Sequence, residues 1–69
     1  MIIKFYEVDA KNIEVLVDGA TYGKLNFDPD RNIWILWPAG IDDGVSYFDN
    51  IEETKEAVKD EIIAFNKEN

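Results

Sequence analysis

Two groups of acidic residues have residue types and spacing that suit metal binding or acid–base catalysis. Asp28, Asp30 and Asn32 follow the D-x-D-x-N spacing that opens an EF-hand calcium loop. That loop also requires a glycine at its sixth position and a glutamate at its twelfth, where this chain has Ile33 and Ala39. The first group therefore predicts a tight turn, closed by side-chain hydrogen bonds to nearby amides, rather than a calcium site.

The second group, Asp42 and Asp43, lies between Gly40 and Gly44. Two carboxylates could exchange protons or hold a metal, but nothing else near them in the sequence supports such chemistry. The chain has no histidine and no cysteine, which removes imidazole bases, thiolate nucleophiles and the usual zinc and haem ligands. Ser46 is the only serine, and without histidine it cannot join a Ser-His-Asp triad. We therefore expect a protein that is not an enzyme and that holds no cofactor or metal.

The chain is strongly acidic. Its 69 residues include 7 Lys and Arg against 15 Asp and Glu, a net charge of −8. This charge repels phosphate backbones and anionic lipid head groups, so direct binding to nucleic acid or membranes is not expected. A basic protein surface is the natural electrostatic complement. The alternative is that the charge only keeps a small domain in solution.

The length and the N-terminal sequence bear on domain organisation and location. A chain of 69 residues has room for one core, so we expect a single domain over residues 1–69. Its first residues lack the basic and long apolar regions of a signal peptide, and no apolar run is long enough to span a bilayer. With no cysteine to form disulfides, these features predict a soluble, cytoplasmic protein.

Turn residues divide the first two thirds of the chain into short segments rich in β-branched and aromatic residues. Asp18-Gly19 offers the left-handed backbone positions of a tight hairpin, and Pro38 ends the most apolar segment. The predicted strands are residues 2–8, 13–17, 21–27, 33–37 and 45–48.

The last third of the chain predicts a helix. Asn50 with Glu53, and Asp49 with Glu52, match the capping-box spacing, and acidic residues favour the start of a helix. An apolar stripe at helical spacing follows, made of Ile51, Thr54, Val58, Ile62 and Phe65. The fold class is therefore predicted as α+β, a small antiparallel sheet of three to five strands with one C-terminal helix packed on one face.

The segment Ile33–Trp37 is apolar on both faces of the predicted strand. One helix covers only one face, so either the set Ile33, Ile35 and Trp37 or the set Trp34 and Leu36 should point away from it. That second face would be covered by loops or would form a surface for a partner or a second copy. Ile63 lies opposite the helix stripe and is also expected to be exposed.

Three consecutive features of the sequence resemble those of a known family. They are the stretch Asn32–Trp37, a glycine-containing loop, and Tyr47–Glu53 leading into the helix. From Tyr22 to Asn66 the order of features resembles the plant ethylene-response-factor type of DNA-binding domain. The resemblance implies three antiparallel strands followed by one packed helix. That family reads DNA with arginines and tryptophans on the exposed sheet face, whereas the bases between Tyr22 and Phe48 are only Lys24 and Arg31. The DNA-binding function therefore does not carry over.

The short acidic format also looks like the small accessory proteins of phages and mobile elements, which often inhibit a host enzyme. We therefore expect a non-enzymatic acidic protein-binding module, specifically a small phage-type inhibitor that mimics nucleic-acid charge on a basic host protein. The alternative is a homodimeric structural or accessory protein without such mimicry. The residues expected at the partner surface are the apolar anchors Trp34 and Trp37 and an acidic rim of Asp28, Asp30, Asp42, Asp43, Glu52, Glu56 and Asp60.

Overall fold

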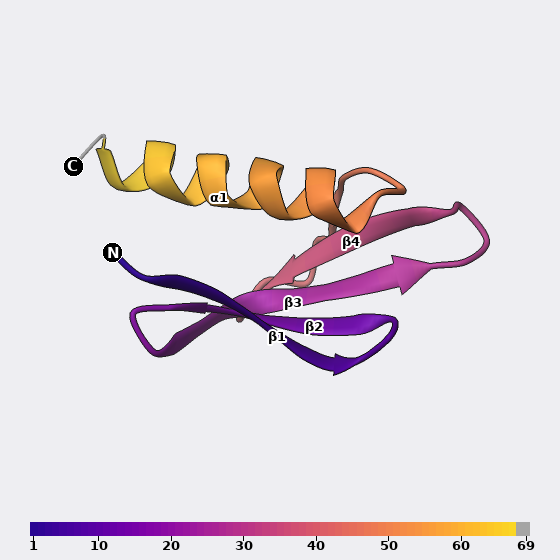
Figure 1. Cartoon of the computed structure of the whole chain (residues 1–69), viewed down its shortest axis with the longest axis horizontal. Coiled ribbons are helices and arrows are strands. Elements are labelled where there is room, and N and C mark those ends of the chain that lie inside the picture. The colour runs from indigo at the N-terminus through magenta and orange to yellow at the C-terminus, as the bar shows by residue number, and fades with distance from the viewer. Residues whose placement is uncertain (68–69) are drawn as a thin grey trace.

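The computed structural model describes residues 1–67, and over these residues the chain forms a five-stranded antiparallel sheet with one helix across one face (Figure 1). The elements in chain order are β1 (Ile3–Asp9), β2 (Asn12–Val17), β3 (Ala20–Asp28), β4 (Ile33–Pro38), β5 (Val45–Ser46) and α1 (Ile51–Lys67). Each strand pairs with the next in sequence, so β1 and β5 are the edges. The predicted α+β class with a C-terminal helix is confirmed.

The turn between β2 and β3 forms where the sequence predicts it. Asp18 and Gly19 have φ values of 50° and 85°, the left-handed conformations that a tight hairpin of this hand needs. The Asp18 side chain also accepts a hydrogen bond from the amide of Ile2 at 2.7 Å, and its own amide donates to the Ile2 carbonyl at 2.8 Å. This turn therefore also fixes the start of β1.

The turn between β3 and β4 is closed largely by Asp28. Its side chain accepts a hydrogen bond from the Asp30 amide at 3.0 Å, and its carbonyl accepts one from the Asn32 amide at 2.8 Å. Asn32 contributes a left-handed backbone with φ of 58°. The predicted turn is confirmed, and within residues 1–67 no cluster of three or more His, Cys, Asp or Glu side chains is placed to hold a metal ion.

The fifth strand is shorter than the predicted segment 45–48, since β5 contains Val45 and Ser46 alone. Backbone pairing with β4 nevertheless continues beyond it. The Tyr47 amide donates to the Trp34 carbonyl at 2.8 Å, and the Trp34 amide donates to the Phe48 carbonyl at 2.9 Å. These bonds lead the chain directly to the start of α1.

The helix begins as the capping pattern predicts. The Asn50 side chain accepts hydrogen bonds from the amides of Glu52 at 2.8 Å and Glu53 at 3.1 Å, which satisfies two amides of the first turn. The next turn is anchored by Thr54, which is fully buried and donates its hydroxyl proton to the Asn50 carbonyl at 2.9 Å. No helix within residues 1–67 is long and apolar enough to cross a membrane.

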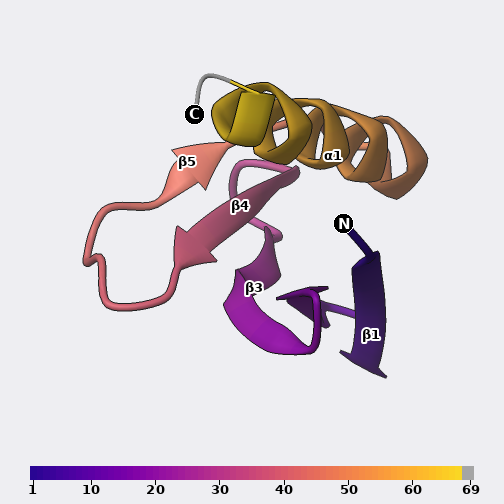
Figure 2. The same cartoon turned by 90° about the vertical axis from the view of Figure 1, so that its left-hand side faces the viewer.

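The core lies between α1 and the sheet (Figure 2). Its buried apolar residues are Ile13, Val15, Leu25, Trp34, Leu36, Val58 and Ile62. The prediction that Phe65 completes this stripe is wrong, because its side chain is 71% exposed. The turn between β2 and β3 lies well apart from the last turns of α1 in Figure 1, so the twisted sheet does not follow the helix to its end.

Candidate interaction surfaces

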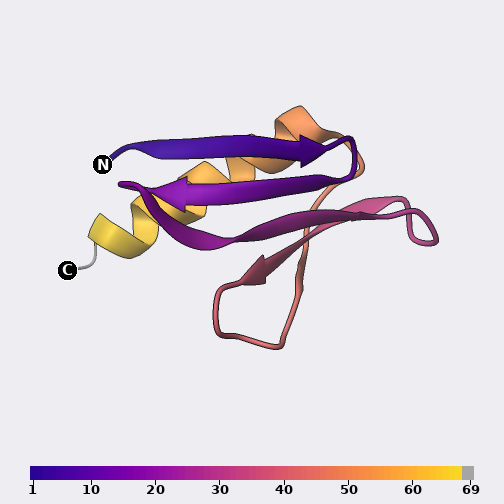
Figure 3. The same ribbon diagram turned by 90° about the horizontal axis from the view of Figure 1, so that it is seen from below.

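The side of the sheet turned away from α1 forms the first surface, which we call the outer sheet face (Figure 3). Side chains alternate along a strand, so the neighbours of buried helix-side residues point to this face. Its residues in the strands are Lys4, Tyr6, Val8, Asp9, Asn12, Glu14, Leu16, Thr21, Lys24, Asn26, Asp28, Ile33, Ile35 and Trp37. Tyr6 and Val8 are 61% and 62% exposed, so large apolar groups remain uncovered here.

The structure decides which side of β4 is buried. Trp34 points to the helix with only 6% of its surface exposed, and its ring meets that of Phe27 edge to face at 5.3 Å. Trp37 points to the outer sheet face and is 41% exposed. Trp34 therefore cannot act as the surface anchor expected from the sequence, which leaves Trp37 as the tryptophan available to a partner.

The loop between β4 and β5 packs against the outer sheet face. A Cβ atom added to Gly44 would lie 2.7 Å from Cγ2 of Ile35 and 3.1 Å from the six-membered ring of Trp37. The backbone of the loop therefore covers part of both side chains, in a place where only glycine fits. Asp42 and Asp43 directly precede Gly44 and are exposed. Two of the expected acidic residues therefore belong to the loop that contacts Trp37.

A row of four side chains crosses the outer sheet face. The strand register aligns Tyr6 with Glu14, Glu14 with Lys24, and Lys24 with Trp37. We call these four residues the cross-strand row. Directly opposed side chains of neighbouring strands lie about 5 Å apart, so the row presents aromatic, acidic, basic and aromatic groups in that order.

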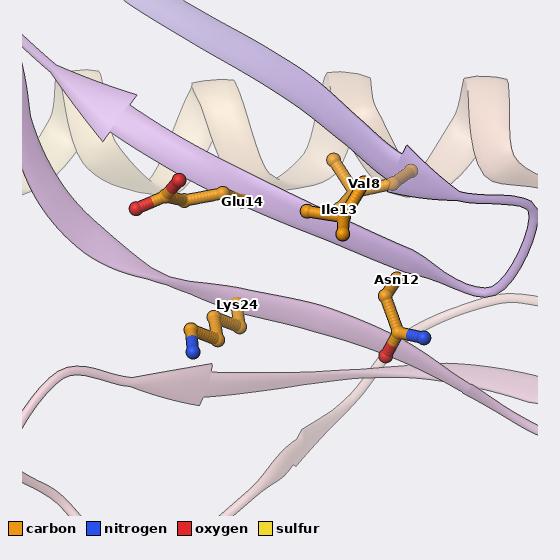
Figure 4. A pocket seen from close by; sticks show the side chains of 5 residues that line it. All are labelled: Val8, Asn12, Ile13, Glu14 and Lys24. Carbon is orange, nitrogen blue, oxygen red and sulfur yellow. The ribbon is translucent and has the colours of Figure 1, made fainter.

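A shallow hollow of about 310 Å³ lies beside the centre of the row, lined by Val8, Asn12, Ile13, Glu14 and Lys24 (Figure 4). Asn12 is held in place because its side-chain oxygen accepts a hydrogen bond from the Asn26 side chain at 2.8 Å. The hollow thus offers one carboxylate and one ammonium group beside an exposed Val8. This arrangement suits polar and apolar contact with another molecule.

The helix side of the molecule forms the second surface. Glu52, Glu56 and Asp60 are exposed and lie four residues apart, so they form a line along α1 with a rise of about 6 Å between neighbours. We call them the acidic stripe. The nearest ion pair is long, 4.0 Å from Lys59 to Glu56, and both groups face solvent, so it neutralises little. Ile63 is 40% exposed on the same side, as predicted.

The expected acidic rim is therefore not one surface. Glu52, Glu56 and Asp60 lie on the helix side, Asp42 and Asp43 lie in the β4–β5 loop, and Asp28 and Asp30 lie in the β3–β4 turn. The Asp28 carboxylate already accepts a hydrogen bond within this turn and lies 3.8 Å from Nε of Arg31. Since α1 and the outer sheet face are on opposite sides of the molecule (Figures 2 and 3), one partner cannot contact Trp37 and the acidic stripe over a flat interface.

One polar contact near the end of the helix has no signal in the sequence. The Tyr47 hydroxyl donates a hydrogen bond of 2.7 Å to Glu61, fourteen residues away. Burial of the phenol and this carboxylate raise the pKa of Tyr47 above its usual value of 10. A hollow of about 320 Å³ beside it is lined by Tyr22, Glu61, Ala64 and Phe65. This hydrogen bond links the segment that follows β5 to the C-terminal half of α1.

Comparison of this chain with known protein families, with curated proteins and with solved structures finds no match.

Proposed function

We propose that this chain is a non-enzymatic acidic module that binds, through the acidic stripe on α1, a basic surface with which a partner protein holds nucleic acid. The observation that carries the proposal is the line of three exposed carboxylates along one side of a rigid helix, in a chain with a net charge of −8. Such a protein would act as an inhibitor, of the kind that phages encode against host proteins.

The spacing of the stripe supports this mode of binding. Carboxylates about 6 Å apart along a helix present anionic oxygens in a regular line, as the phosphates of a nucleic-acid strand do. Lys and Arg side chains that bind phosphates also bind carboxylates, to which they donate charge-assisted hydrogen bonds. The net charge of −8 would steer the chain toward a basic surface and raise the rate of association.

The proposal is tested with two variants of equal charge. The stripe variant carries Glu52→Gln, Glu56→Gln and Asp60→Asn, and the control variant carries Asp30→Asn, Asp42→Asn and Asp43→Asn. Each changes the net charge from −8 to −5, since three carboxylates are lost. Proteins captured from a bacterial lysate by the immobilised wild-type chain at low salt are then challenged with duplex DNA.

We expect DNA to displace the captured partner, the stripe variant to lose it and the control variant to retain it. Capture that DNA does not reverse, or a captured partner that both variants retain, would contradict the proposal. Equal loss in both variants would mean that net charge alone matters and not the line of carboxylates.

A second candidate function, a homodimeric accessory protein, is favoured by the exposed aromatic groups of the outer sheet face. Tyr6 and Trp37 are separated there by one acidic and one basic side chain rather than by a run of carboxylates.

A further inference from the structure

We infer that the outer sheet face binds a second copy of this chain, with the two sheets face to face and a two-fold axis parallel to the strands between β2 and β3. The inference is independent of the proposed binding of a basic partner, because it uses the opposite side of the molecule. It rests on the charge, the order of the cross-strand row and the exposed apolar groups of this face.

The strands of the outer sheet face carry charges of both signs. Within the described strands, Lys4 and Lys24 contribute two positive charges and Glu14 one negative charge. Asp9 and Asp28 pair with Asn12 and Ile33 and add two negative charges, so the strands of this face carry −1 in total, and Asp42 and Asp43 of the β4–β5 loop add two more negative charges beside it. The strands of this face therefore offer both positive and negative groups to a second copy, while the loop carboxylates would lie at the rim.

The cross-strand row is complementary to its own reverse. A two-fold axis along the strands, placed between Glu14 and Lys24, reverses the row in the second copy. Each Tyr6 then faces the Trp37 of the other copy, and each Glu14 faces the other Lys24. Aromatic groups meet aromatic groups and opposite charges meet, as an isologous interface between identical chains requires.

The same geometry leaves the other side of the molecule free. Facing sheets pack about 10 Å apart with strand directions within about 30°, a separation that Tyr6 and Trp37 side chains can fill. The β4–β5 loop, resting on Trp37 through Gly44, would form the rim of the contact. Both α1 helices would point outward, since they cover the opposite sheet faces (Figure 2).

The dimer is expected to be weak. The row spans three strand spacings, about 14 Å, and the face is therefore smaller than a standard interface of about 800 Å² on each partner. We expect a dissociation constant on the order of 10 µM at moderate salt. Sedimentation velocity of the full chain from about 1 µM to 500 µM spans this range.

A charge swap tests the register of the contact. Lys24→Glu places two carboxylates opposite each other and should weaken the dimer about tenfold or more, and Glu14→Lys should weaken it similarly. The double variant with both changes restores opposite charges in the reversed row and should return the dissociation constant to within about threefold of the wild type. Lys59→Glu, on the helix side, is the matched control, since it changes the net charge by the same −2 as Lys24→Glu.

Each outcome decides the inference, once circular dichroism shows that the variants are folded. A concentration-dependent dimer that Lys24→Glu weakens, Lys59→Glu does not and the double variant restores would support it. A monomer at all concentrations would overturn it. A dimer that Lys24→Glu and Lys59→Glu weaken equally, or that the double variant fails to restore, would place the contact elsewhere and overturn it as well.

Discussion

The two tryptophans of β4 should respond very differently to replacement by alanine, because they lie on opposite faces of the sheet. Trp34 is 94% buried (100 − 6) and Trp37 is 59% buried (100 − 41). Removing a fully buried tryptophan side chain costs about 3–5 kcal/mol, through lost transfer free energy and the cavity left behind. Loss of the edge-to-face contact with Phe27 adds about 1 kcal/mol.

The same argument gives a smaller cost for Trp37→Ala. Multiplying the transfer and cavity cost by the ratio of the two buried fractions, 59/94, lowers this cost to about 2–3 kcal/mol. Water can fill the space at a surface site, so no enclosed cavity remains and the expected cost falls to about 1–2 kcal/mol. A domain of 69 residues has a free energy of unfolding of about 3.5–10 kcal/mol. Trp34→Ala should therefore remove much or all of the stability, whereas Trp37→Ala should leave a folded protein.

Urea unfolding followed by far-ultraviolet circular dichroism measures both costs. Protein concentrations near 1 µM keep the proposed dimer dissociated, so that Trp37 reports on the monomer alone. Trp34→Phe is the matched control, since it retains an aromatic ring beside Phe27, and should cost less than Trp34→Ala. Equal costs for the two alanine variants, or a cost below about 2 kcal/mol for Trp34→Ala, would refute the assignment of Trp34 to the core.

Three further predictions concern the helix start, the tyrosine contact and the loop. Asn50→Ala should lower the free energy of unfolding by about 1 kcal/mol in urea titrations, because its side chain accepts two amide hydrogen bonds of the first helical turn; an unchanged value would contradict the cap. The pKa of Tyr47 is raised in the folded state by burial and by its bond to Glu61, so its stabilising contribution is complete below the unfolded pKa of about 10 and decreases above it. Between pH 9 and about 11 the wild type should therefore lose more stability than Tyr47→Phe, and parallel pH curves would disprove the contribution. Gly44→Ala would place a methyl group 2.7 Å from the Ile35 side chain, so the loop must move and the Trp37 fluorescence should shift to longer wavelength; unchanged emission would argue against the close approach.

The sequence was sufficient for the elements that depend on neighbours in the chain. The Asp18-Gly19 hairpin and the Asn50 cap are each settled within about four residues, and both formed where the pattern predicted. The order of strands followed from the turns between them, because short connections join adjacent antiparallel strands. Local side-chain and backbone preferences therefore predicted the architecture.

The orientation of β4 could not be predicted in the same way. Both of its faces are apolar, so the pattern does not distinguish Trp34 from Trp37. The choice depends on register with β3, which aligns Phe27 with Trp34 and Lys24 with Trp37. Register is set by pairing between strands and by which face the helix covers, and neither is a local property.

Contacts at the helix end were missed for a related reason. The register between β2 and β3 shifts between Val15 and Leu16, and Tyr22 packs against the core. Gly23 borders this bulge, but a glycine inside a strand does not by itself show whether a bulge forms or which residue it leaves unpaired. The Tyr47–Glu61 bond and the exposure of Phe65 depend in turn on how far the twisted sheet follows the helix.

The separation of the two surfaces gives the two proposals opposite responses to salt. Two copies with a net charge of −8 each repel at long range, so screening should strengthen a dimer held by apolar contacts and short-range charge pairs. Binding of the acidic stripe to a basic partner depends on long-range attraction, and the same screening, with a Debye length of about 8 Å at 0.15 M, should weaken it. A dimer would also carry two acidic stripes on outward-facing helices, so that two basic sites on one partner could be bound at once with increased avidity. Self-association and partner binding through one common face would instead compete, and the position of the acidic stripe and the outer sheet face on opposite sides of the molecule is what makes them compatible.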